Sequence, residues 1–143
     1  MDELTRSKAI PVFGYLKDPL FLGASLLYGI NRFLLKPRFG PQFPFLRNHW
    51  NDCFLIPTAL PVLLWLLRKS RLRGHDAPPT WSEIAQWTLL WSLLFEGVFP
   101  RFLHWGTADW RDALCYAAGA CAAGLLWNKP FSRAASNRSP TRG

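Results

Sequence analysis

The sequence contains few acidic residues, cysteines and histidines. Its 143 residues include 9 Asp and Glu against 17 Lys and Arg, a formal net charge of +8. The 3 cysteines, Cys53, Cys115 and Cys121, lie in apolar segments without the paired spacing of a zinc site or a disulfide framework. The motifs H-E-x-x-H and G-x-S-x-G and a phosphate-binding glycine loop are also absent. No standard catalytic signature is therefore present, and neither a metal nor another cofactor is expected.

The excess of positive charge does not indicate nucleic-acid binding. The basic residues flank apolar segments and form no separate basic domain, as a phosphate-binding surface would require. The first 18 residues are polar and include acidic and basic side chains, so no cleavable signal peptide is expected.

Apolar residues make up 50% of the chain and fall into four blocks separated by charged connections. This alternation predicts an all-α integral membrane bundle of four transmembrane helices, near residues 19–35, 50–67, 81–100 and 110–127. These helices would form one membrane domain, residues 1–128, followed by a basic, disordered tail, residues 129–143. The mean hydropathy is only +0.02 because Lys and Arg in the connections lower the average.

Individual residues indicate where these four segments begin, end or bend. Residues 19–35 are at the short limit for a span, and an interfacial amphipathic helix is the alternative there. Lys36 and Pro37 are expected to end that segment. Pro57 and Pro61 predict a kink or local opening in the second segment. Thr80 or Ser82 can cap the third, with Glu83 in its first turn.

The distribution of Lys and Arg predicts the orientation. Most of them lie in the N-terminal segment, in the middle loop around residues 68–73, and in the tail. The positive-inside rule places these parts in the cytoplasm of a bacterial inner membrane protein, with the 101–109 turn outside.

Polar residues gather at the predicted outer side, and Glu96 is the most informative of them. A carboxyl group one turn below the interface costs about 2–3 kcal/mol, so Glu96 should have a partner, a raised pKa, or both. The cluster could bind a cation, a proton or a polar lipid headgroup; alternatively, two arginines neutralise the carboxylates and the cluster is structural. The candidate residues are His49, Asp52, Glu96, Arg101, His104, Asp109, Arg111 and Asp112. The histidines and carboxylates are competent metal ligands, but they lack close spacing, so no metal is assigned.

The fourth segment is rich in small residues that allow close helix packing. One row could meet a neighbouring helix of the bundle, and another could meet a further helix or a second copy of the chain. The candidate packing residues are Ala113, Ala117, Gly119, Ala120, Cys121 and Gly124.

The last third of the chain resembles VanZ-like membrane proteins. The residues that carry this resemblance are Glu96, Pro100, Arg101, Thr107, Asp109, Asp112, Tyr116, Gly119 and Gly124. Two features depart from the family pattern: Tyr116 stands where an Asn is usual, and the early polar motif is matched only loosely by residues 48–52. The resemblance implies a several-span envelope protein, but it does not carry antibiotic resistance over to this chain.

Three classes of function follow from these observations. The first is a non-enzymatic envelope factor whose outer cluster contacts lipid-linked or cell-wall material, with membrane lipids or another membrane protein as partners and no nucleic acid. The second is a small secondary transporter in which Glu96 carries a proton or ion. The third is an intramembrane enzyme.

Overall fold

The structure, a computed structural model, describes residues 12–103 and 109–129. Every regular element in these described residues is helical, which confirms the all-α prediction. The elements are η1 (Tyr15–Lys17), α1 (Pro19–Ile30), η2 (Asn31–Leu35), α2 (Lys36–Phe39), α3 (Pro44–Asn48), α4 (Trp50–Cys53), α5 (Leu55–Lys69), α6 (Trp81–Ser92), η3 (Leu93–Leu103) and α7 (Trp110–Trp127).

The first helical run is longer than the sequence predicts. Asp18 caps α1 by accepting hydrogen bonds from Leu20 N and Phe21 N at 3.0 and 3.1 Å. The chain then widens into a π-helical turn, η2, in which the Lys36 N–H donates to Asn31 O. The prediction that Lys36 and Pro37 end the helix is wrong, because the helical run continues through both residues to Phe39.

The second predicted segment is broken at Phe54. α4 ends at Cys53, α5 begins at Leu55, and Phe54 between them has φ −100° and ψ 0°. Pro57 consequently lies in the first turn of α5, where its nitrogen needs no intrahelical partner. Pro61 is the proline inside α5. The interruption of this segment therefore precedes both prolines.

The third and fourth helices begin at identifiable caps. Thr80 and Glu83 form a capping box on α6, as the sequence predicts for Thr80. α6 changes after Ser92 into the π-helical segment η3, which contains Pro100 and extends to Leu103, past the predicted end at residue 100. Asp109 caps α7, accepting from Arg111 N at 3.0 Å, and α7 has the predicted bounds.

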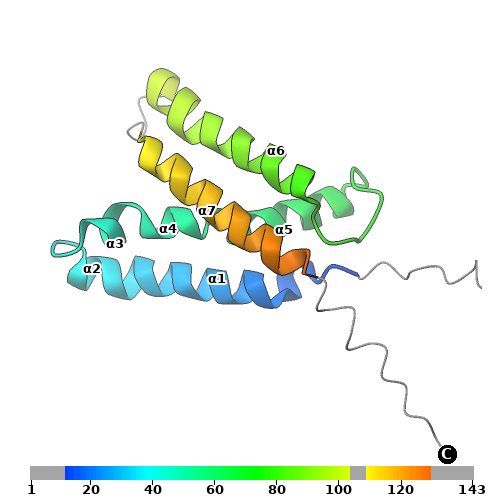
Figure 1. The fold of residues 1–143 in the computed structure, drawn as a ribbon, viewed down its shortest axis with the longest axis horizontal. Helices are drawn as coiled ribbons and strands as arrows, with labels where there is room; N and C mark the ends of the chain where they lie inside the picture. Colours follow the sequence, from blue (N-terminus) through cyan, green and yellow to red (C-terminus); the bar gives the residue numbers. More distant parts are fainter. Residues whose placement is uncertain (1–11, 104–108, 130–143) are drawn as a thin grey trace, which may run out of the picture.

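The core lies around α5. Its fully buried Ile56, Leu60 and Leu64 pack with Ile84 of α6 and Ala120 of α7. In Figure 1, α7 crosses in front of α5 and lies between α6 and α1. It contacts α4, α5, α6 and η3, so it joins the two halves of the fold.

The loop between α5 and α6 is held by a polar network around Arg73. This guanidinium is 5% exposed and donates to Glu83 Oε1 at 3.1 Å, Tyr15 Oη at 3.0 Å and Ala77 O at 2.9 Å. Burial opposes its charge, but the hydrogen bonds to Glu83 and Tyr15 raise the pKa of Arg73. Burial and the hydrogen bond with Asp76 raise the pKa of Tyr15, and the Arg68 guanidinium lowers the pKa of Asp76.

The start of α1 and the end of α7 lie at this same end of the molecule. Phe13 N donates to Asp76 O at 2.6 Å, Trp127 Nε1 to Asp18 Oδ1 at 3.0 Å, and Asn128 Nδ2 to Pro79 O at 3.2 Å. The 70–80 loop therefore shares one end of the bundle with the segments before α1 and after α7 (Figure 1). We call it the loop end.

Many large apolar side chains are exposed on the outward faces of the long helices. Leu26 on α1 is 64% exposed, Leu89 on α6 is 70% exposed and Leu125 on α7 is 60% exposed. Measured over the described residues, none of the helices has both the length and the apolar character required to cross a lipid bilayer.

Candidate functional site

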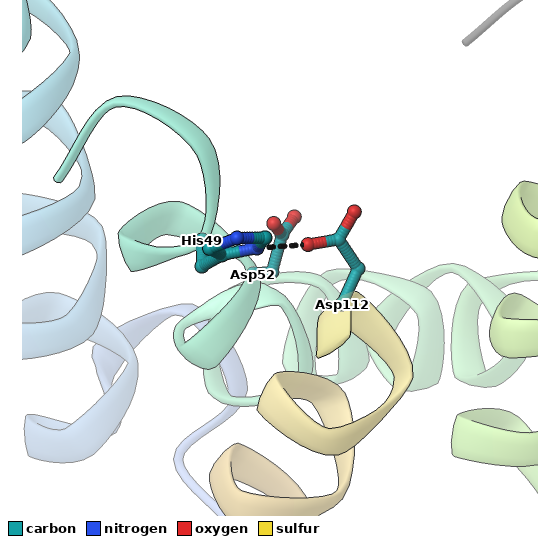
Figure 2. Close-up of side chains that lie close together, drawn as sticks. All are labelled: His49, Asp52 and Asp112. Carbon is teal, nitrogen blue, oxygen red and sulfur yellow. Dashed lines mark hydrogen bonds and ion pairs between the residues drawn. The ribbon is translucent and has the colours of Figure 1, made fainter. Parts of the chain in front are cut away.

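Three of the predicted polar residues converge at the end of the bundle opposite the loop end. His49 precedes α4, Asp52 lies within α4, and Asp112 is in the first turn of α7. His49 Nδ1 and Asp112 Oδ1 are 2.5 Å apart, and ligand atoms of all three residues lie within 4.8 Å of one another. Figure 2 shows the imidazole and the two carboxylates grouped where the α4 turn meets α7.

Glu96 lies near this group and is held by the start of α7. Its Oε2 accepts from Asp109 N at 2.7 Å, and its Oε1 accepts from Tyr116 Oη at 3.2 Å. Asp52 interacts electrostatically with both Asp112 and Glu96. We call His49, Asp52, Glu96 and Asp112 the acidic site.

The arginines do not neutralise these carboxylates. None of the ion pairs between described residues joins Arg101 or Arg111 to Glu96, Asp109 or Asp112. Both arginines are exposed, and the Arg111 guanidinium lies 5.9 Å from the Trp110 ring centroid. The structural alternative, a network of Arg–carboxylate pairs, is therefore not seen in this part of the chain. His104, also a predicted member of the cluster, lies outside the described residues, as does Thr107.

Close packing sets the distance between the two halves of the acidic site. A Cβ on Gly119 would clash with the Cys53 carbonyl oxygen, so α7 approaches the α4 turn at a separation that only glycine permits. Asn31, which is fully buried, steadies the same turn. Its Nδ2 donates to Leu46 O at 3.0 Å and to Asn51 Oδ1 at 2.9 Å.

The predicted packing residues of α7 divide between two faces. Gly119, Ala120 and Gly124 are buried, and Gly124 faces the Trp81 ring. Ala113 is half-buried, whereas Ala117 and Cys121 are exposed. The Ala117 and Cys121 row is therefore exposed in the described chain, and its place against another helix or a second copy remains a prediction.

Sequence reasoning missed the supporting contacts of three residues. Helical spacing places Tyr116 on the stripe of the fourth segment that faces the Glu96 stripe of the third, but it does not predict that Tyr116 donates to Glu96. Asn31 and Asn51 form an interhelical hydrogen bond that ties η2 to α4. A buried Asn inside an apolar segment is a usable signal, because such a group requires a hydrogen-bond partner. The pairing of His49 with Asp112 could not be found from spacing, since 63 residues separate them.

An apolar cleft of about 230 Å³ is lined in part by Cys53, the residue that follows Asp52. Its walls come from α1, α5 and α7 and include Ala24, Leu27, Pro57 and Ala122. Apart from Cys53, the residues that line the cleft carry no polar side chain.

Comparison of the chain with protein-family models, curated proteins and solved structures finds no match. The geometry of the acidic site is therefore the principal basis for assigning a function.

Proposed function

We propose that this chain is a non-enzymatic, multi-pass protein of the bacterial inner membrane. Its acidic site, at the outer end of the bundle, contacts lipid-linked or cell-wall material. The observation that carries the proposal is the distribution of polarity. Carboxylates and an imidazole gather at one end, and the basic loop end lies opposite, with outward-facing leucines such as Leu26, Leu89 and Leu125 between them.

The apolar exterior supports the membrane location. A protein in water rarely leaves contiguous leucine-rich faces uncovered, whereas lipid favours them. α7 is flanked by Trp110 and Trp127, as membrane interfaces favour, and its 18 residues extend about 27 Å. α6 falls short alone, but it continues through η3 as one helical run from 81 to 103.

The acidic site and the neighbouring cleft together suit an amphiphilic ligand. Polar groups of the ligand would meet His49, Asp52 and Asp112, and an apolar portion would lie in the cleft beside Cys53. The resemblance to VanZ-like proteins favours the same role.

The transporter alternative is less well supported. A carrier needs polar groups that continue across the bundle. Below Glu96, Thr88 donates to Ile84 O at 2.7 Å, and the interior around it consists of Ile56, Leu60, Leu64 and Ile84. Among the described residues, the polar path from Glu96 towards the loop end is therefore thin.

Substitutions in cells can test the proposed function. Glu96→Gln and Asp112→Asn should each sensitise cells to envelope stress as strongly as deletion does, with normal amounts of protein in the membrane. Asp76→Asn, the same chemical change at the loop end, should have no effect. Equal resistance in all three variants would contradict the proposal, and loss of measurable ion uptake in Glu96→Gln would favour the transporter.

A further inference from the structure

We propose that His49, Asp52 and Asp112 bind a divalent transition-metal ion such as Zn²⁺ or Mn²⁺. Imidazole nitrogen and carboxylate oxygen are the ligands these ions favour. The three side chains come from two separate segments, and their ligand atoms lie within 4.8 Å of one another. A single ion with ligand bonds of ~2.0–2.2 Å can therefore reach all three after small side-chain movements.

The charges at this end of the molecule also favour a cation. The carboxylate of Asp52 lies near those of Asp112 and Glu96. The basic group paired with one of these carboxylates is the His49 imidazole, which contacts Asp112. All of these side chains are partly buried, so solvent screens their repulsion incompletely. Neither Arg101 nor Arg111 forms an ion pair with them among the described residues. A divalent ion would neutralise this excess of negative charge.

The surrounding structure holds the ligands in place. The close contact between Gly119 and Cys53 fixes α7 against the α4 turn, and the His49 ring packs 6.0 Å from the Phe45 ring. Asn31 is fully buried beside the turn, and its Oδ1 has no hydrogen-bond partner in the described part of the chain.

The ligand set discriminates between ions. A nitrogen ligand disfavours Mg²⁺ and Ca²⁺, which prefer oxygen alone, and the absence of thiolate disfavours Cu⁺. Three protein ligands leave at least one coordination position for water or for an oxygen of a bound ligand. His49 Nδ1 would bind the ion in place of its present contact with Asp112.

Metal titration of the purified, full-length chain tests this proposal, which rests on the proposed function of the same site. After treatment with a chelator, the protein should bind about one equivalent of Zn²⁺, measured by calorimetry and elemental analysis. Asp52→Asn, Asp112→Asn and His49→Gln should each weaken binding at least ~10-fold, because loss of a ligand exceeds the usual effect of its supporting residues. Affinity should fall as the pH is lowered, because protons compete for His49 and the carboxylates.

Matched controls come from the same chain. Asp76→Asn removes a carboxylate at the loop end, and His75→Gln removes an imidazole there; neither should change Zn²⁺ affinity. Circular dichroism of every variant verifies helical content, and the visible spectrum of the Co²⁺-loaded wild type gives a readout that needs no substitution. Absence of stoichiometric binding by folded wild type, or equal loss in the controls, would overturn the proposal.

The two proposals can fail separately. If the purified protein binds no metal but Asp112→Asn still sensitises cells, the metal proposal fails and the proposed envelope function stands. If the protein binds Zn²⁺ stoichiometrically at this site but the substitutions have no effect in cells, the metal proposal stands and the proposed envelope function fails.

Discussion

Gly119 controls how closely α7 approaches the turn between α4 and α5. A methyl group there would meet the Cys53 carbonyl, which is backbone and cannot move independently. We expect Gly119→Ala to destabilise the protein by about 1–3 kcal/mol, the usual cost of overpacking. Unfolding monitored by circular dichroism measures this change.

Gly29 of α1 is the matched control. A Cβ there meets nothing within 4 Å, so Gly29→Ala should be neutral or stabilise by about 0.5–1 kcal/mol. Equal effects at the two glycines would mean that the α7 contact does not fix the acidic site. Gly119→Ala should also weaken Zn²⁺ binding, because it would move Asp112 on α7 away from His49 and Asp52.

At the scale of elements, the start of α6 couples a helix cap to a buried ion pair. Glu83 completes the capping box with Thr80 and also pairs with the buried Arg73. Glu83→Ala should therefore cost about 3–5 kcal/mol, because it leaves a buried guanidinium without its counter-ion. Thr80→Ala, which removes the cap alone, should cost about 1 kcal/mol.

Ser82→Ala provides the baseline for this comparison. Ser82 is exposed and only accepts a 3.4 Å hydrogen bond from Gln86, so its loss should lie within about ±0.5 kcal/mol. Thermal unfolding of the three variants ranks them. A ranking in which Thr80→Ala is the most destabilising would show that Arg73 does not depend on Glu83.

The elements differ in how far the sequence predicts them. The caps at Thr80 and Asp109 and the extent of α7 follow from local chemistry, so they can be recognised directly. The break at Phe54 and the π-helical turns depend on tertiary packing around Asn31 and the start of α7, and no local pattern indicates them. Sequence reasoning placed His49, Asp52 and Asp112 in one outer cluster, but it could not predict the direct contact between His49 and Asp112.

For the whole molecule, the decisive property is what surrounds the outward-facing leucines. Leu89 is 70% exposed and lies near the middle of the α6–η3 run. In a bilayer, Leu89→Asp should oppose insertion by about 3 kcal/mol and lower the amount of protein recovered with membranes. In water, the same change at an exposed position would be nearly neutral.

Fractionation of cells expressing the two forms measures this difference. Wild type should remain with the membranes after an alkaline wash and be released by detergent. Gln86→Asp, an exposed polar position one turn earlier on α6, is the control and should fractionate as wild type does. Recovery of wild type in the aqueous fraction would contradict the proposed location.

The π-helical turns make the number of residues, as well as their identity, part of what builds the acidic site. A π-helical turn contains about one residue more than an α-helical turn. If the same residues formed a regular α-helix without the wide turn, everything beyond the turn would be rotated by about 100°. Glu96 would then turn away from Tyr116 with no side chain altered. The wide turns of η2 and η3 therefore decide which face of each helical run carries Asn31 and Glu96.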